Sequence, residues 1–405
     1  MSDAHVVGER IAFHRKRAGL SQVEFANVVG RSESWVSQVE RGARPIDRMS
    51  VLQRVADALS VSVAELRGDD DVQAPEERPE AFDTIRLALT GHPALGPLLG
   101  ASRPSASARV LDKLRNQHAR VWELVHASRY ADLAPILAEL IPGLEATVRT
   151  TTGQGLREAR DLLSDTYQAA AAMMAKLGET DAAWVAADRA GFCAERAGSP
   201  LAVAASMFRM AHVFLALGQT DQAHRVATEA VEALGQQAHT QPEPEVLSLY
   251  GAFHLVLAIA AARDNERTDA HGYLDTARGI ADRLGEDRND FGTEFGPTNV
   301  AIHAVSVAVE LGDAGQAIEL SGLVDATTLS PERQARYLLD VAQAHSMRRR
   351  IGEALRALQD AERVAPEETR VHHLSRAITR DLLQLSGTRP RPELRDLAER
   401  FGVLP

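Results

Sequence analysis

The feature that most constrains this fold is a stripe of small or apolar residues that recurs along the chain. Five times after residue 180, a short turn precedes a segment with such residues at positions i, i+4 and i+7. This spacing puts three side chains on one face of an α-helix, where small residues let a neighbouring helix approach closely. The sets begin 40, 47, 47 and 37 residues apart. They are Ala183, Ala187 and Ala190; Ala223, Ala227 and Ala230; Ala270, Leu274 and Ala277; Ala317, Ser321 and Val324; and Ala354, Leu358 and Ala361.

The turns between these segments have the residues that end and start helices. Segments 177–181 and 217–221 read Leu-Gly-Glu-Thr-Asp and Leu-Gly-Gln-Thr-Asp. Glycine ends one helix, and Asp181 and Asp221 are expected to cap the next. No segment shows the sustained alternation of a β-strand. The pattern predicts an all-α fold, with an α-solenoid of lengthened helical hairpins over residues 81–405.

The composition agrees with closely packed helices and indicates where in the cell the protein is expected. Only 4% of the residues are aromatic, and alanine supplies much of the apolar share. No apolar run reaches the roughly 20 residues of a membrane span, and the N-terminus lacks the features of a signal peptide. The single cysteine, Cys193, is expected to be a small buried residue and not a reactive thiol. We therefore expect a soluble, cytoplasmic protein without a membrane partner.

Charge and composition divide the chain. The overall net charge is −11, but residues 1–68 carry +2 and the remainder −13. An acidic, proline-containing stretch at 69–80 predicts a linker, and a second break is expected at 91–107. We thus predict a small domain at 6–68, a linker at 69–80 and a helical-repeat domain at 81–405. The acidity of the large domain does not exclude nucleic-acid binding by the small one, since that footprint is local.

The small domain contains a helix-turn-helix pattern. Ser21 and Glu24 have the spacing of a capping box, Gly30 allows a tight turn, and Ser32 is expected to cap the next helix. Two further helical segments are expected at 48–58 and 63–66. The pattern predicts a five-helix unit with little spare apolar surface.

These residues resemble the Cro/C1-type (XRE) helix-turn-helix family. The run Gly19-Leu20-Ser21-Gln22, the pair Phe25-Ala26 and the motif Glu40-Arg41-Gly42 fall at the family's spacing. The resemblance implies that 32–41 is the recognition helix in the DNA major groove. It also implies an internal ion pair between Arg15 and Glu40. Trp35 departs from the smaller or phenolic residue often found at its position, and either a core or a DNA-facing placement is open.

The family resemblance assigns roles to individual residues. Gln22 is expected to contact the DNA backbone, Ser32 to start the recognition helix, and Glu33, Ser34 and Gln38 to read bases. An acid in the first helical turn also favours the positive helix end without DNA, which is the competing explanation for Glu33. The phosphate contacts are expected from Ser37, Arg41, Arg44 and Arg48.

The repeat domain resembles tetratricopeptide repeats, and the whole layout resembles the peptide-responsive quorum-sensing regulators of the RRNPP group and actinomycete regulators of the same plan. The resemblance implies a ligand on the concave face formed by the first helix of each hairpin, with asparagine holding a peptide backbone. The candidates are Arg209, His212, Asn299, His303, Arg336 and Tyr337. Each could instead be an ordinary helix residue, and Thr298 and Asn299 could simply cap their helix.

No chemistry-bearing motif points to an enzyme, a metal or a cofactor. The fourteen histidines form no ligand pattern, and adjacent His372 and His373 point to different helix faces. The sequence therefore predicts a homodimeric transcriptional regulator that binds a double-stranded DNA operator and senses a peptide or small molecule. Its dimer interface is expected in the C-terminal hairpins, around 336–385. The alternative is a DNA-targeted scaffold whose solenoid holds a partner protein.

Overall fold

The structure, a computed structural model, is all-α. It describes residues 3–17, 20–42, 44, 46, 49–59, 63, 66, 80–90, 108–387 and 390–404. Within these ranges no β-strand forms, and one antiparallel bridge joins Arg288 to Phe295. The chain divides into two compact units, the first formed by residues 1–78 with 263–265 and the second by residues 79–262 and 266–405. Of the expected linker, 69–79 lie outside the described residues and Glu80 starts a helix; the expected break at 91–107 is also outside them.

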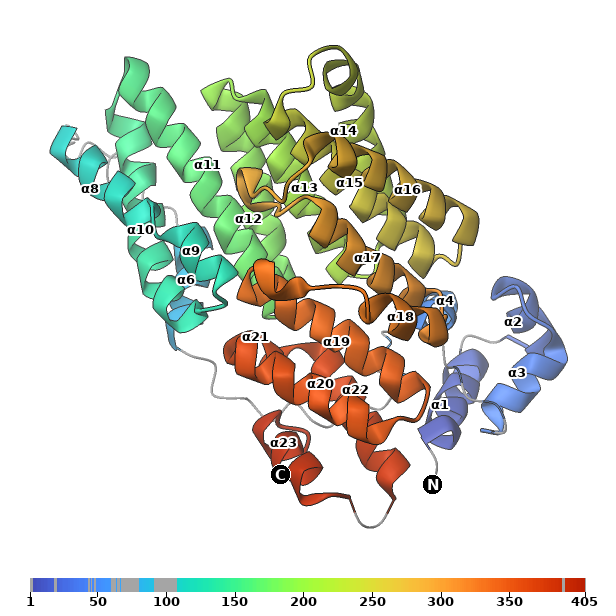
Figure 1. The fold of residues 1–405 in the computed structure, drawn as a ribbon. Helices are drawn as coiled ribbons and strands as arrows, with labels where there is room; N and C mark the ends of the chain where they lie inside the picture. The colour runs from blue at the N-terminus through green and yellow to red at the C-terminus, as the bar shows by residue number, and fades with distance from the viewer. Residues whose placement is uncertain are drawn as a thin grey trace. The chain divides into compact units, whose positions relative to one another are not determined.

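The first unit has four described helices around a small core (Figure 1). They are α1 (Asp3–Arg17), α2 (Gln22–Val28), α3 (Glu33–Glu40) and α4 (Met49–Leu59). Gly8 lies where α1 crosses α3, because a Cβ there would stand 2.2 Å from the carbonyl oxygen of Val39. The core includes Ile11, Phe25, Val36, Val55 and Leu66. Of the expected fifth helix, only Val63 and Leu66 are among the described residues.

The first unit has more exposed apolar surface than its sequence suggested. Phe13 is 61% exposed, Val28 60%, Val23 49% and Met49 48%. The expectation of little spare apolar surface is therefore wrong. A unit this small cannot cover every apolar side chain of its helices.

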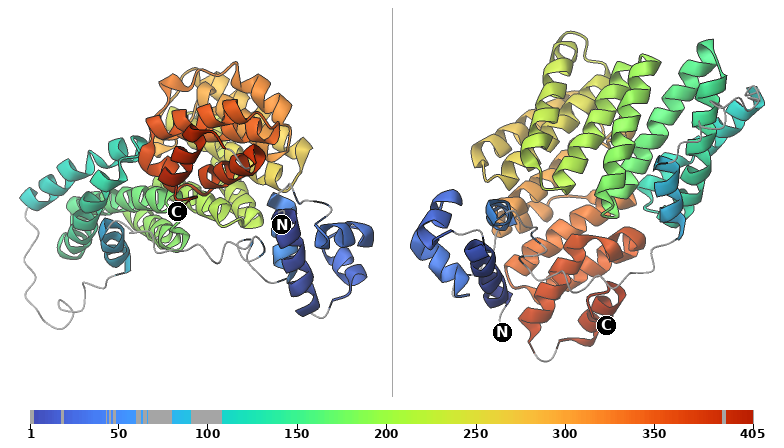
Figure 2. Two further views of the ribbon diagram at one scale, coloured as in Figure 1. Left: turned by 90° about the horizontal axis from the view of Figure 1, so that it is seen from below. Right: turned by 180° about the vertical axis from the view of Figure 1, so that it is seen from behind.

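The second unit is a series of helical hairpins (Figures 1 and 2). Its hairpins pair α11 with α12, α13 with α14, α17 with α18, and α19 with α20, and α15 and α16 share one hydrophobic core; Figure 2 shows α11 to α14 side by side. The bounds are α6 Glu80–Thr90, α8 Ala108–His118, α9 Val121–His126, α10 Tyr130–Thr150, α11 Gly153–Lys176, α12 Thr180–Ala197, α13 Pro200–Ala216, α14 Thr220–Thr240, α15 Pro244–Arg263, α16 Arg267–Leu284, η2 Asp290–Gly292, α17 Pro297–Glu310, α18 Ala314–Ser321, η3 Ala326–Thr328, α19 Pro331–Met347, α20 Ile351–Val364, α21 Pro366–Val371, α22 His373–Ser386 and α23 Pro392–Arg400.

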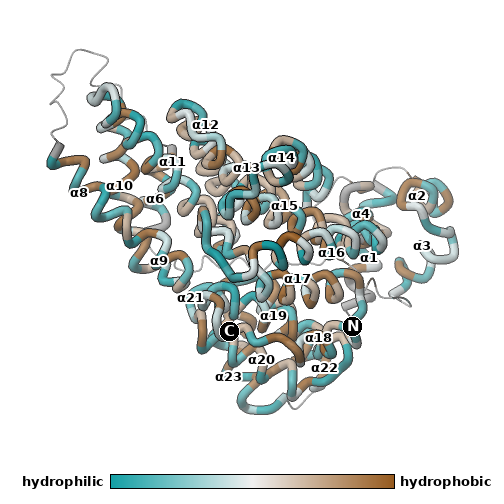
Figure 3. The backbone as a smooth tube through the Cα atoms, turned by 45° about the horizontal axis from the view of Figure 1, so that its top comes forward, coloured by the Kyte–Doolittle hydropathy of each residue, from teal (hydrophilic) through white to brown (hydrophobic). Residues whose placement is uncertain are grey.

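The small-residue stripes lie on the second helix of each hairpin and are buried, as predicted, in four of the five sets. Ala183, Ala187 and Ala190 on α12, for example, are between 0% and 2% exposed. The set on α18 is the exception, because that helix ends at Ser321 and leaves Val324 beyond it. Most helices of this unit carry both hydrophilic and hydrophobic residues along their length (Figure 3), as expected for helices with one buried face.

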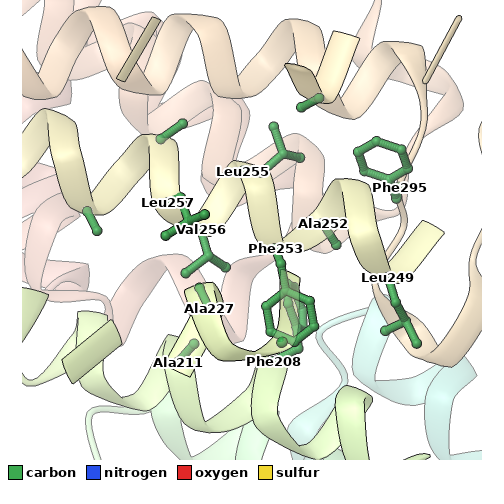
Figure 4. Close-up of a cluster of buried hydrophobic side chains, with 14 of the residues drawn as sticks. Phe208, Ala211, Ala227, Leu249, Ala252, Phe253, Leu255, Val256, Leu257 and Phe295 are labelled. Atoms are coloured by element: carbon green, nitrogen blue, oxygen red, sulfur yellow. The ribbon is translucent and has the colours of Figure 1, made fainter. Parts of the chain in front are cut away.

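Helix α15 is the most buried element of the second unit. Phe253 on α15 packs edge to face on Phe208 of α13, with ring centroids 5.9 Å apart (Figure 4). By length and composition α15 could cross a membrane, contrary to the expectation that no apolar run is long enough, but 83% of its most apolar window is buried inside the protein. Its apolar character is thus explained by a position in the core.

The hairpin turns follow the sequence expectation at glycine but not at aspartate. Gly178 and Gly218 adopt positive φ values of 79° and 71°. The helices that follow them have Glu179 and Gln219 at the N-cap, without side-chain capping bonds. Asp181 and Asp221 lie in the first helical turn, so the capping role expected for them is wrong; there a carboxylate favours the positive end of the helix dipole.

Candidate DNA interface and candidate ligand site

The helix-turn-helix pair is built by two side-chain caps. Ser21 and Glu24 form the predicted capping box of α2, with Glu24 N donating to Ser21 Oγ at 3.1 Å and Ser21 N to Glu24 Oε2 at 2.8 Å. The bond from the Ser21 backbone lowers the pKa of Glu24. Ser32 accepts from Trp35 N at 3.1 Å and so caps α3. Between them Gly30 has φ 66°, a left-handed conformation that other residues rarely adopt.

Arg15 and Glu40 tie α1 to the end of α3. Arg15 Nη2 donates to Glu40 Oε2 at 3.0 Å, and both side chains are less than 9% exposed. Arg15 Nη1 also donates to the Leu20 carbonyl at 2.6 Å. The bond to Glu40 raises the pKa of Arg15. The expected internal ion pair is confirmed, and Gln22 joins it by donating from Nε2 to Glu40 Oε2 at 2.7 Å.

The predicted base-reading residues lie together on α3. Glu33 and Ser34 are exposed in its first turn, and Gln38 is half-buried one turn further on. Ser32 and Arg44 are exposed, and Ser37 is half-buried. Arg41 is exposed and donates from Nε to the Ser37 carbonyl at 3.0 Å. Arg48 lies outside the described residues.

Trp35 packs against the core of the first unit with its ring partly buried. The guanidinium of Arg31 stands 5.7 Å from the centroid of that ring. The sequence left its placement open, and the structure gives it a packing role.

Three of the six predicted ligand residues line one small cavity in the second unit. His212 on α13 and Asn299 and His303 on α17 face it, with Arg333 on α19. An apolar wall is formed by Phe208, Leu215, Ala252, Leu255, Val256 and Ile259. The cavity volume is about 20 Å³, room for about one water molecule. A peptide or metabolite could enter only if a neighbouring segment moved.

The polar groups of this cavity are neutral apart from Arg333. Burial lowers the pKa of His303 to about 3 and puts that of His212 well below its usual value. His303 Nδ1 lies 2.8 Å from the Asn299 carbonyl oxygen, so Nδ1 carries the proton and donates. Asn299 is 2% exposed, and its Oδ1 has no hydrogen bond. The cavity therefore suits the part of a ligand in which a small polar group is attached to an apolar one.

The cap of α17 is not made by Asn299. The helix has Gly296 at its N-cap, and Asp287 Oδ1 accepts from the backbone of Thr298 at 3.0 Å. The explanation that Thr298 and Asn299 simply cap the helix is therefore wrong, because a side chain from outside the helix does so.

The other three predicted ligand residues have separate surroundings. Arg209 is buried on α13, and its Nη2 donates to the carbonyls of Phe291 at 2.8 Å and Gly292 at 2.9 Å. Burial lowers the pKa of Arg209 to about 10. Arg336 Nη1 lies 3.2 Å from His372 Nε2. Tyr337 donates to the Ser321 carbonyl at 2.8 Å.

Sequence reasoning missed a buried polar cluster beside the cavity, which we define as His126, Lys176, Glu294, Glu332 and Arg333. His126 Nδ1 lies 3.3 Å from Glu294 Oε2 and 3.6 Å from Glu332 Oε2. Lys176 contacts Glu332, and Arg333 Nε lies 3.5 Å from Glu294 Oε2. Its members come from α9, α11, the α16–α17 loop and α19, so no local pattern in the sequence could show it.

The polar cluster has ligand types that suit a metal ion, but its charges are already balanced. Three of its side chains offer ligand atoms within 4.8 Å of one another. Lys176 and Arg333 neutralise the two carboxylates and hold the pKa of Glu332 well below its usual value against the effect of burial. Burial lowers the pKa of His126, but the two carboxylates outweigh it and raise that pKa. A divalent cation would add two uncompensated buried charges, so we interpret the cluster as an ion-pair network.

Cys193 is half-buried on α12. Burial raises the pKa of its thiol to about 11. The thiol is therefore protonated near neutral pH, which agrees with a packing role.

Comparison with known proteins places the first unit. Residues 6–67 match the family model described as helix-turn-helix domain. An uncharacterized HTH-type transcriptional regulator, YazB of Bacillus subtilis (strain 168), is 38% identical over 64 residues, which are 16% of this chain and 91% of that protein. The solved structure of Bacillus thuringiensis PlcR in complex with the peptide PapR7 and DNA aligns over 85% of this chain and 98% of its own, at 11% identity and a TM-score of 0.29. A TM-score this low does not establish a shared overall fold.

Proposed function

Because the chain belongs to the helix-turn-helix transcriptional regulators, we propose that it reads a specific operator through α3 and that its second unit senses a peptide or small molecule. The observation that carries the first part is the polar row of Glu33, Ser34 and Gln38 on α3. Glutamine can pair with adenine and glutamate can accept from cytosine. Arg41 and Arg44, with Arg48, are assigned to phosphates, which position the helix without reading sequence.

Two substitutions test the DNA assignment. Gln38→Ala should reduce the preference for the operator over random duplex, by about 1–3 kcal/mol for a good base contact. Arg44→Ala should weaken both duplexes alike and reduce the salt slope by about one. Arg54→Ala, an exposed arginine on α4, is the matched control and should change neither. Unchanged footprints for both test variants would mean that α3 is not the recognition helix.

The ligand part of the proposal rests on Asn299. Its Oδ1 is buried without a hydrogen bond in a cavity with an apolar wall and neutral histidines, and a buried acceptor of this kind favours a partner that donates to it. We assign the ligand to this cavity and to Arg209 beside it. The protein then acts as a ligand-controlled binding protein and not as an enzyme.

Two variants, one on α17 and one in the loop before it, separate ligand binding from helix capping. Native mass spectrometry of protein purified from its own host would identify the retained ligand, and that ligand would be titrated against the protein–operator complex. Asn299→Ala should abolish the ligand's effect on DNA binding and leave ligand-free DNA affinity intact. Asp287→Ala should lose about 1 kcal/mol of stability with the response preserved. A normal response from Asn299→Ala would end the assignment.

A partner protein on the solenoid is the second candidate function. It is favoured by two exposed aromatic residues on α12, Phe192 at 56% and Trp184 at 44% exposed. Aromatic side chains are enriched in protein interfaces. The same mass measurement distinguishes the candidates, because a partner protein adds far more mass than a short peptide or a metabolite.

A further inference from the structure

The loop between α16 and α17, residues 285–296, lies against several distant helices (Figure 1). It closes on itself where Arg288 N donates to the Phe295 carbonyl at 2.9 Å. Asn289 Nδ2 lies 2.9 Å from His126 Nε2 on α9, and Ser248 on α15 donates to Asp290 at 2.6 Å. The loop thus connects hairpins that the chain order keeps apart.

Two arginines from first helices hold the loop by its main chain. Arg209 on α13 donates to the carbonyls of Phe291 and Gly292. Arg333 on α19 donates to the next carbonyl, that of Thr293, at 3.3 Å. The two arginines therefore bind three consecutive backbone carbonyls and none of the side chains of those residues. A protein can bind the backbone of a peptide in the same way.

The C-terminal end of this segment is held by its side chains. There the Phe295 ring is fully buried against Gly251 of α15, where a Cβ would stand 2.0 Å from it. Beside it, Glu294 accepts from Ser330 N at 3.2 Å and Ser330 Oγ at 2.8 Å and belongs to the polar cluster. Glu294 is thus the one loop side chain bound by both α9 and α19.

The closed loop is strained and leaves the groups around it incompletely bonded. Phe291 and Glu294 both have φ 52°, in the left-handed region that residues with a Cβ disfavour. Arg209 Nε and Asn299 Oδ1 are buried without a hydrogen bond. A different occupant could satisfy these atoms, so the loop is not their best possible partner.

We propose that the α16–α17 loop is a strap that occupies the ligand site, the cavity beside Asn299 together with Arg209, as an intramolecular stand-in for the ligand, with Glu294 as its latch. The ligand enters by displacing the strap from Arg209 and Arg333, which then bind the ligand instead. This explains why the cavity beside Asn299 has room for only about one water molecule. The inference rests on the proposed ligand function, but the opening of the strap can be measured without any ligand.

Hydrogen exchange of the full-length protein tests the latch. Glu294→Gln removes the charge that His126 and Arg333 bind, while Glu286→Gln makes the same change on a 65% exposed side chain of the same loop. Exchange of 286–296 should rise at least tenfold in Glu294→Gln and stay at the wild-type rate in Glu286→Gln. Exchange in α13, α15 and α17 should not change, because only the strap opens.

Two results would overturn the strap. One is an unchanged exchange rate for 286–296 in Glu294→Gln, and the other is a rise shared equally by α13 and α17, which would make the loop an inseparable part of the core. If Glu294→Gln does not fold, Ser248→Ala, which removes only the bond to Asp290, should give a smaller rise confined to the same segment. A strap that opens in a protein whose DNA affinity responds to no ligand would show that the loop can open, but it would refute the ligand function and with it the role of the strap as a stand-in for the ligand.

Discussion

Glu40 accepts hydrogen bonds from Arg15 and from Gln22, so a single carboxylate connects three helices of the first unit. Breaking a buried ion pair by removing one partner is costly because the other charge stays buried. In the second unit, by contrast, burial lowers the pKa of His254 and His303, so these histidines are neutral at pH 7 and destabilise the fold only when the pH falls. Glu40 therefore stabilises the fold through its charge, whereas the buried histidines stabilise it only in their neutral form.

Removing Glu40 should destabilise the first unit strongly. Glu40→Ala leaves the Arg15 guanidinium buried without its carboxylate and should cost about 3–5 kcal/mol. The double variant Arg15→Met with Glu40→Leu should recover most of that loss, because it removes both charges. Urea unfolding followed by fluorescence, with Trp122 and Trp184 replaced by Phe so that Trp35 alone reports, measures the effect, and a loss below 1 kcal/mol in Glu40→Ala would contradict it.

The stability of the second unit should fall as the pH is lowered from about 7. Burial lowers the pKa of His254 from about 6.5 to about 4, so protonation favours the unfolded chain. The stability that depends on neutral His254 is fully present above pH 6.5. It is lost as the pH falls toward 4, and the loss in unfolding free energy is about 3 kcal/mol. His303 acts in the same direction, whereas His126, whose pKa is raised, acts in the opposite one.

Chemical denaturation at a series of pH values measures this dependence of the unfolding free energy on pH. His254→Phe should flatten the dependence of the unfolding free energy on pH between 7 and 4. An equally steep dependence in this variant would show that His254 is not buried in its neutral form.

At the scale of elements, α15 is set apart by having neighbours on nearly every side. Leu249, Phe253 and Val256, which Figure 4 labels, are among the buried side chains of this helix. Gly251 gives it one further contact, since only a residue without Cβ leaves room for the Phe295 ring. The exposed helices α12, α14 and α16 have one buried face and tolerate change on the other.

Two glycine substitutions on neighbouring helices should have opposite effects. Gly251→Ala should destabilise the second unit by about 1–3 kcal/mol, because the added methyl overlaps the buried Phe295 ring. Gly279→Ala on α16, where a Cβ meets nothing within 4 Å, should stabilise it by up to about 1 kcal/mol. Thermal unfolding of both variants measures the two shifts, and equal shifts would refute the packing argument.

At the scale of the molecule, the second unit is closed by contacts between its early and late helices. Glu368 on α21 accepts from Ser128 at 2.8 Å and from Tyr130 at 2.9 Å, and Glu367 accepts from Ala131 N at 2.8 Å. A solenoid ordinarily bonds only neighbouring repeats, so these bonds join repeats that would otherwise unfold independently. These bonds lie within one chain and do not show where two chains would meet. Apolar side chains are exposed in both units, so either unit could provide a dimer interface.

We expect a homodimer joined through the C-terminal hairpins, with two copies of α3 on half-sites about 34 Å apart or a multiple of it. Met347, at the end of α19, is 44% exposed there. Met347→Glu should shift the sedimenting species to the 43.8 kDa monomer and weaken operator binding. Phe13→Ser in the first unit should leave the dimer intact. The reverse result would move the interface to the first unit, and a wild-type monomer with tight half-site binding would refute dimerisation.

The sequence by itself determined the features that arise within one or two turns of helix. The Ser21–Glu24 capping box, the Ser32 cap and the buried stripes such as Ala223, Ala227 and Ala230 depend on spacings of three or four residues, which the helix itself fixes. Even the Arg15–Glu40 pair was predicted, through its resemblance to a known family.

The tertiary structure alone decided which distant groups meet. Asp287 caps α17 in place of Asn299, and Trp35 packs on the core. His126 meets Glu294 from the α16–α17 loop and Glu332 from α19. Spacing along the chain carries no information on such meetings, because they depend on how the helices cross. Once buried, an unpaired polar group costs more free energy than a local helix preference gains, so packing overrides the local pattern at these residues.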